Sequence, residues 1–263
     1  MNEKMKMNFA TSSCLGQAFT GIFFFLALGG MVLALTVGGF FGVWSAFLEY
    51  KKGLLEYGTH FTILQTALKS DAVCFFLPIF STFPFAASFL EDMESGFIKS
   101  YLPRTGRRHY ITGKILAAGI SGGMVSVAGI GIYYRMLQLI LLPMEKKAAM
   151  DMIDMAYGND IYRACVLFFC VGMLFSLLGM LFSAITSSKY MAYASPFVLE
   201  YTLIILHERY LKTLYMIDPK EWLIPTESQW FLGQTGVMIF VLMLVILIAI
   251  LLLVVMMGRI EEL

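Results

Sequence analysis

Long apolar runs alternate with short polar segments along this chain of 263 residues. A helix needs about 20 apolar residues to cross the hydrocarbon core of a bilayer, and several runs approach or exceed that length. The runs extend over 18–47, 72–90, 115–135, 164–185, 191–206 and 236–257. We therefore predict an all-α membrane protein with six transmembrane helices, built as a single transmembrane domain over residues 1–263.

Composition supports an integral membrane protein. Hydrophobic residues make up 59% of the chain and charged residues 14%, and the mean hydropathy of +0.77 lies far above that of water-soluble domains. The first apolar run is longer than the roughly 7–15 residues of a signal-peptide core, so we expect it to be retained as a membrane helix. The net charge of +1 says nothing about partners. For a membrane protein of this kind we expect membrane lipids, and no nucleic acid, as partners.

The densest polar segment lies between the second and third apolar runs, from Glu91 to Lys114. It holds five of the nineteen lysines and arginines. Six spans would put both termini on the same side of the membrane as this segment. The two sides carry nearly equal numbers of cations, but this side concentrates its cations in shorter segments, which predicts a cytoplasmic location for it and for both termini.

The same segment contains a spaced motif, an acid-x-Gly-x-x-Lys followed by Pro-Arg and then by Arg-x-x-Tyr-x-x-x-Lys. The motif residues are Glu94, Gly96, Lys99, Pro103, Arg104, Arg107, Tyr110 and Lys114. This pattern resembles the ABC-2-type permeases of ATP-driven exporters. The string from Glu94 to Lys99 is most similar to permeases of Gram-positive bacteria, several of which serve in bacteriocin or lantibiotic export and self-protection.

The resemblance implies an ABC-2-type permease fold with a cytoplasmic coupling helix between the second and third spans, which docks on a separate ATPase subunit. The motif residues, together with Glu91, would form this ATPase-coupling interface, and ATP and Mg²⁺ would bind to the partner rather than to this chain. The permease would pair with itself or with a paralogous permease in the bacterial cell membrane and would export an amphipathic substrate. Export and self-immunity remain open alternatives.

Physical arguments bear on the proposed coupling helix. A short helix parallel to the membrane can present charge to a partner while its apolar residues stay in the interface. Gly96 and Pro103 would bracket this helix as breaker and terminator. The alternative is a basic loop that serves only to set topology. The family's amphipathic helix before the first span could lie only within residues 1–17, and the sequence leaves it open.

The segment 207–235 matches the family's outer region of short helices that dip into the membrane. Trp222 and Trp230 suit an interfacial site there. Five glycines in the third run predict close helix packing. They are Gly119, Gly122, Gly123, Gly129 and Gly131.

Residues for chemistry on this chain are scarce. Gly113-Lys114 is followed by Ile115 and lacks the earlier glycine of a phosphate-binding loop, so ATP binding in the usual way is excluded. The three histidines lie in separate polar segments without metal-ligand spacing, and we interpret the four cysteines as small hydrophobic residues. We therefore predict neither a catalytic nor a metal site.

Glu200 is the exception, because it lies within the fifth apolar run. A carboxylate near the bilayer centre costs at least about 2.5 kcal/mol, so it should face protein or water. It is either a residue of the translocation pathway or a structural carboxyl that orders neighbouring helices. An ion-coupled secondary carrier or channel, which would need no ATPase, is the alternative function. A membrane-embedded enzyme or a scaffold is a third.

Overall fold

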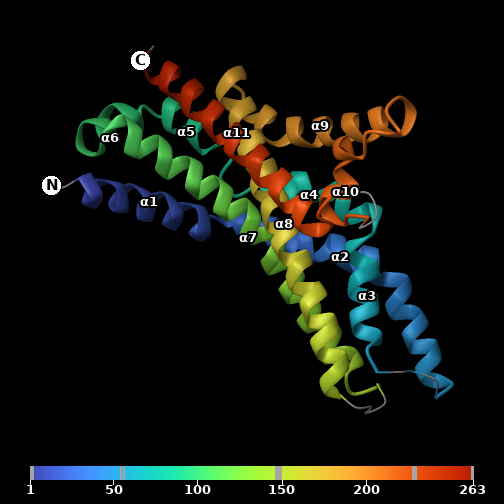
Figure 1. The fold of residues 1–263 in the computed structure, drawn as a ribbon. Coiled ribbons are helices and arrows are strands. Elements are labelled where there is room, and N and C mark those ends of the chain that lie inside the picture. The colour runs from blue at the N-terminus through green and yellow to red at the C-terminus, as the bar shows by residue number, and fades with distance from the viewer. Residues whose placement is uncertain (1–2, 54, 56, 146–149, 227–229, 262–263) are drawn as a thin grey trace.

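The computed structural model describes residues 3–53, 55, 57–145, 150–226 and 230–261, and the side chains at 3–6, 8–10, 104 and 150–157 lie outside this description. The described residues form helices and turns, and no strand occurs among them. Figure 1 shows the helices α1 (Glu3–Thr20), α2 (Ile22–Lys51), α3 (Thr59–Leu68), α4 (Asp71–Thr82), α5 (Ser88–Glu94), α6 (Phe97–Thr105), α7 (Arg107–Leu141), α8 (Met150–Thr186), α9 (Lys189–Arg209), η1 (Tyr215–Ile217), α10 (Pro219–Leu223) and α11 (Gln234–Glu261).

The all-α, multi-pass membrane character is confirmed, but six spans are not. Among the described residues, four helices are long and apolar enough to cross a membrane, namely α2, α7, the Gly158–Thr186 part of α8, and α11. The α3–α4 pair adds a fifth if it is one broken span, since its two helices pass the same test together but bend by 65°.

The second span differs from its sequence prediction. Residues 72–90 do not form one helix, because α4 ends at Thr82, a turn that contains Pro84 follows, and α5 begins at Ser88. Proline has no N–H to donate and disfavours continuation of the preceding helix. The preceding stretch lies between two predicted spans, yet α3 lies within it and buries residues at helical spacing. The buried residues are His60, Phe61, Ile63, Leu64, Ala67 and Leu68.

The fifth predicted span corresponds to α9, which is not among the helices that are long and apolar enough to cross a membrane. Its 21 residues include Lys189, Glu200, Glu208 and Arg209, which lower its apolarity compared with α11. Helix α9 follows α8 after a tight turn and leads to the short helices η1 and α10. The described chain therefore contains four spans, or five with the broken pair.

Helices α7 and α8 form the centre of the molecule. Close packing through the glycines of α7 is confirmed, because a Cβ added at Gly122 would lie 2.4 Å from the Cβ of Ser176 on α8. Gly119, Gly123 and Gly129 are similarly crowded, whereas Gly131 has open space around it. The Ser176 hydroxyl donates a hydrogen bond to the Ala118 carbonyl across this interface (2.7 Å).

The central pair is longer than a bilayer is thick. With 35 and 37 residues, α7 and α8 extend over about 52 and 55 Å, against a hydrocarbon core of about 30 Å. In Figure 1 the C-terminal end of α7 and the N-terminal end of α8 lie beside α3 and the C-terminal end of α2. The first and last described residues and α6 lie at the opposite end. The protein therefore has two distinct ends, and each carries a cluster of charged residues.

Candidate functional site

The segment that carries the motif forms a separate short helix, α6, between two glycines. Gly96 has φ +70° and Gly106 has φ +86°, a backbone region that residues with a Cβ rarely adopt. Each glycine therefore allows a sharp change of direction, from α5 into α6 and from α6 into α7. Pro103 was predicted to terminate this helix but lies inside it. The terminator is Gly106, because its φ takes the chain out of the helical region.

Helix α6 is anchored on one side and open on the other. Ile98 and Thr105 are buried against the rest of the protein, whereas Phe97, Lys99 and Ser100 are exposed. The Phe97 ring stacks on the half-buried Tyr101 ring at a centroid distance of 5.1 Å. Lys99 therefore extends from a helix whose orientation is fixed by packing.

A buried polar cluster lies beneath this helix and is centred on Asp92 of α5. Its Oδ2 accepts a hydrogen bond from the Tyr110 hydroxyl (2.5 Å) and lies 2.8 Å from the Lys114 Nζ. Lys114 also donates to the Ser88 carbonyl (3.3 Å), and its ammonium lies 4.6 Å from the centre of the Phe85 ring. The Lys114 side chain is only 1% exposed and the Asp92 side chain 19% exposed, so the ammonium is shielded from water and the carboxylate is partly hydrated.

This geometry divides the motif residues into two groups. Tyr110 and Lys114 were predicted to belong to an exposed ATPase-coupling surface, but both are buried and point towards Asp92. They are four residues apart on α7 and so share one face of the helix. The motif did not include Asp92. The signal in the sequence was an acidic residue upstream of a tyrosine and a lysine that lie four residues apart.

The remaining motif residues lie at or near the surface. Glu94 pairs with Lys189 at the start of α9 (2.6 Å), and Arg107 pairs with Glu261 near the end of α11 (3.8 Å). The hydrogen bond to Glu94 raises the pKa of the Lys189 ammonium. Glu91 is exposed. Arg104 belongs to α6, but its side chain lies outside the described residues.

A helix precedes the first span, which the sequence left open. Helix α1 packs along α7 and also touches α6, and it ends where Gly21 adopts an extended conformation before α2. Its inward residues Cys14 and Ala18 are buried. Helix α1 therefore supports the same end of the molecule that carries α6.

Glu200 lies away from α6, at a second candidate site beside α9. It is 2% exposed, and its Oε1 has no hydrogen-bond partner among the described residues. The side chain lines a cavity of about 250 Å³ between α4, α9 and α10. The burial is what the sequence predicted for a carboxyl inside an apolar run, and it leaves the pathway and structural roles both open.

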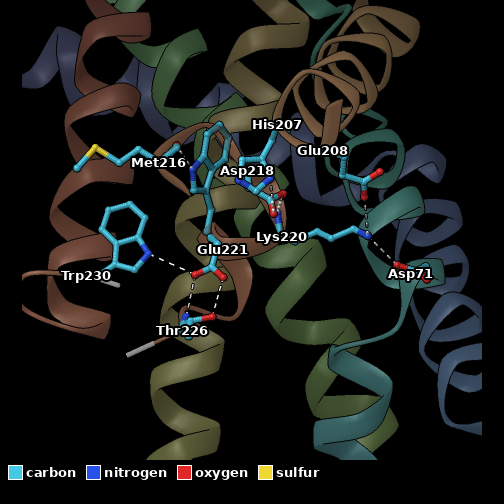
Figure 2. Close-up of polar contacts among 10 residues, drawn as sticks. Asp71, His207, Glu208, Met216, Asp218, Lys220, Glu221, Thr226 and Trp230 are labelled. Carbon is cyan, nitrogen blue, oxygen red and sulfur yellow. Dashed lines mark hydrogen bonds and ion pairs between the residues drawn. The ribbon is translucent and has the colours of Figure 1, made fainter. Parts of the chain in front are cut away.

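The rim of this cavity carries an ion-pair cluster, drawn in Figure 2. The Lys220 Nζ lies 3.1 Å from the Asp71 Oδ1 and 4.0 Å from the Glu208 Oε1. Burial lowers the pKa of the Lys220 ammonium, but the hydrogen bond and attraction to Asp71 outweigh this effect and leave the pKa raised. On the neighbouring turn, His207 Nδ1 lies 3.4 Å from Asp218.

The segment 207–235 contains the short helices η1 and α10, as expected, but its tryptophans lie inside the protein. Trp222 donates its indole N–H to the Met216 carbonyl (2.8 Å), and Trp230 donates to Glu221 (3.4 Å). Both rings are buried among other residues of this chain, and their interfacial depth in the membrane stays a prediction. The Glu221 carboxylate also accepts from the backbone N–H and hydroxyl of Thr226.

The far end of the molecule holds a buried pair that the sequence did not suggest. The Glu145 carboxylate accepts hydrogen bonds from the His60 ring (2.9 Å) and from the backbone N–H groups of His60 (2.9 Å) and Gly58 (3.1 Å). It therefore caps the first turn of α3. Across the described part of the chain, no group of three or more His, Cys, Asp or Glu side chains is placed to hold a metal ion.

Comparison with protein-family models, with curated proteins and with solved structures finds no match to this chain. The function proposed below therefore depends on the residues and contacts of this chain alone, together with the motif resemblance.

Proposed function

We propose that this chain is the transmembrane permease subunit of an ATP-driven exporter and that α6 is its docking element for a separate ATPase. One observation carries the proposal: a short helix between two positive-φ glycines exposes Lys99 while a buried Asp92–Lys114 pair fixes the segment before it. A topology signal requires only positive charge. A topology signal does not require a helix held rigidly in one orientation.

The two groups of motif residues have different roles in this proposal. Glu91, Glu94, Lys99 and Arg107 form the exposed docking surface. Asp92, Tyr110 and Lys114 act as positioning residues, because their contacts hold α5, which leads into α6, against α7. Since α7 packs along α8 in the centre of the molecule, a push on α6 would tilt the central pair.

The partner ATPase would bind ATP and Mg²⁺, and this chain would supply the path. Helices α2 and α11 expose long apolar faces, which suit lipid or a second permease, either another copy or a paralogue. The exporter would move an amphipathic peptide, antimicrobial, lipid-like molecule or drug out of a bacterial cell, with both termini of this chain in the cytoplasm.

The competing function is an ion-coupled carrier without an ATPase, and Glu200 is the observation that favours it. A buried carboxyl beside a cavity is a typical feature of proton- or cation-coupled transport. The two functions differ in their energy source, so an ATPase requirement for transport separates them.

The proposed function is tested by purifying the chain from its native membrane and measuring whether an ATPase with a phosphate-binding loop co-purifies with it. Lys99 makes no ion pair with any residue that the structure describes, so Lys99→Glu changes the docking surface without breaking an internal contact. We expect this variant to insert normally and to lose ATPase association at least tenfold. The matched control is Lys212→Glu, an exposed lysine on the outer segment, which should leave association unchanged.

A charge reversal at Glu94 needs a second control, because it also breaks the pair with Lys189. The double variant Glu94→Lys with Lys189→Glu restores an internal pair with the charges exchanged. If Glu94 contacts the partner, association should stay weak in the double variant. Normal association in Lys99→Glu and in the Glu94 variants would reduce α6 to a topology signal. Transport by the chain alone would establish the ion-coupled function.

A further inference from the structure

The cavity beside Glu200 is built from one face of α9 and the first turns of α4, and Lys220 of α10 lies at its open rim. The α9 residues lie at helical spacing and therefore share one side of the helix. The lining of the cavity is Asp71, Cys74 and Phe75 on α4, Phe197, Glu200, Tyr201, Ile204, Ile205 and Glu208 on α9, and Lys220. The cavity thus has a defined floor, walls and rim.

The charges of the cavity do not balance. Three carboxylates line it, at Asp71, Glu200 and Glu208, against the single ammonium of Lys220. Lys220 is held at the rim by Asp71 and Glu208, and these two acids are largely exposed. Glu200 is two helical turns, about 12 Å, deeper than Glu208, and one of its oxygens has no partner. A buried carboxyl without a partner holds a proton unless a counter-charge is supplied, so a cation bound beside Glu200 would stabilise its ionised form.

The walls of the cavity are apolar and aromatic. The Phe75 and Phe197 rings meet edge to face at 4.7 Å, and Phe197 stacks on Tyr201 at 6.3 Å. Aromatic faces attract organic cations through the negative charge above the ring. A metal ion or a hydrated small cation would instead require several oxygen ligands, and the floor offers only Glu200.

The size of the cavity limits the occupant. Sites for drug-sized molecules measure about 300–1,000 Å³, whereas this cavity measures about 250 Å³. We propose that it binds an organic cation of side-chain size, an ammonium or guanidinium group on an apolar stem, with the charge at Glu200 and the stem against the aromatic side chains that line the cavity. The cation could be carried by a free small amine or by a basic side chain of a peptide, since both present the same chemistry.

This inference rests on the proposed transport function only where it treats the bound cation as a substrate. Binding of the cation itself requires no ATPase. The test uses the purified full chain in phosphatidylcholine nanodiscs and equilibrium dialysis with radiolabelled 2-phenylethylammonium. The neutral analogue 2-phenylethanol, which has the same shape, measures the apolar contribution. We expect the cation to bind at least tenfold more tightly than the neutral analogue.

Variants assign the binding to Glu200. Glu200→Gln keeps the shape and should weaken cation binding at least tenfold without changing binding of the neutral analogue. Glu208→Gln is the matched control at the rim and should weaken cation binding less than threefold. Ile204→Trp fills the cavity and leaves Glu200 intact, so it should abolish binding of both probes. It keeps the proposal testable if Glu200→Gln folds poorly.

Competition identifies the source of the cation. Displacement of the labelled amine by an acetylated Gly-Lys-Gly amide, but not by its norleucine counterpart, would indicate a peptide side chain. Displacement by small amines alone would indicate a free amine. Equal cation binding by wild type and Glu200→Gln, or equal binding of the charged and neutral probes, would overturn the proposal. Because no ATPase is present, that result would leave docking at α6 untouched.

Discussion

Loss of the Asp92 carboxylate should destabilise the protein more than loss of any exposed charge in the same segment. The variant Asp92→Asn keeps the size of the side chain and an acceptor for the Tyr110 hydroxyl, but it removes the counter-charge of Lys114. Lys114 is 1% exposed and Asp92 19% exposed. Breaking a buried pair by removing one partner costs about 3–5 kcal/mol. Because Asp92 is partly hydrated, we expect the lower end, about 3 kcal/mol.

A double-mutant cycle isolates the interaction itself. Lys114→Met removes the ammonium and keeps most of the apolar stem, so Asp92→Asn combined with Lys114→Met leaves no unpaired charge. The double variant should be more stable than either single variant, because replacing both partners of a buried pair is often close to neutral. We expect a coupling energy of about 2 kcal/mol, within the usual range for residues in contact.

The measurement is unfolding by sodium dodecyl sulfate in mixed micelles, followed by far-ultraviolet circular dichroism. Glu94→Gln is the matched control, because the Glu94–Lys189 pair is about half exposed and exposed pairs contribute at most about 1 kcal/mol. A coupling energy below about 0.5 kcal/mol between Asp92 and Lys114 would refute the reasoning. It would mean that water screens the pair and that it does not hold the segment before α6 rigidly.

Three further outcomes are expected. A cysteine at Ser100 should resist an impermeant maleimide in intact cells and one at Thr213 should react, because both are exposed and we place them on opposite sides of the membrane; the reverse pattern would invert the topology. Gly122→Ala should lower stability by about 1–3 kcal/mol through overpacking, whereas Gly131→Ala, with open space around it, should not, as thermal unfolding in detergent would show. Glu145→Gln should speed hydrogen exchange at the first turn of α3 by removing a charged cap worth about 1–2 kcal/mol, and unchanged exchange would contradict that role.

The apolar runs predicted the membrane helices well where one run forms one helix. Helix α11 occupies the cleanest apolar run, and its ends agree with the predicted span within a few residues. The glycines of α7 were likewise predictable, since small residues at one helix face imply a close neighbour. Both signals are local, and neither requires knowledge of the tertiary contacts.

The broken helices were not predictable in the same way. Helix α3 contains Thr59, His60 and Gln65 and has only 10 residues, too few to cross a bilayer alone, yet one face is buried against α2 and α7. The 65° bend between α3 and α4 lies at the break that contains Ser70. The Ser70 hydroxyl caps α4 by accepting a hydrogen bond from the Val73 N–H. Only the tertiary packing shows that the polar stretch is a buried helix and that the span is bent.

The candidate sites could be predicted only in part, because their residues contact partners that are distant along the chain. The sequence indicated that residues 91–114 matter but could not show that Asp92 faces inward, because its partners lie 18 and 22 residues away along the chain. His60 and Glu145 are 85 residues apart. Such pairs form because each buried charge requires a counter-charge or hydrogen bonds, and the fold alone determines which residue supplies them.

That requirement also distinguishes the buried charged residues from one another. Lys114 has Asp92, and Glu145 has His60 together with two backbone N–H groups. Glu200 is as buried as these residues, but one oxygen has no partner in the described chain. The other buried charges among the described residues are paired internally, so an unpaired carboxyl oxygen beside an open cavity favours the bound cation proposed above. The missing partner is therefore best supplied from outside, by a bound cation, which makes Glu200 the residue where substrate recognition should be sought first.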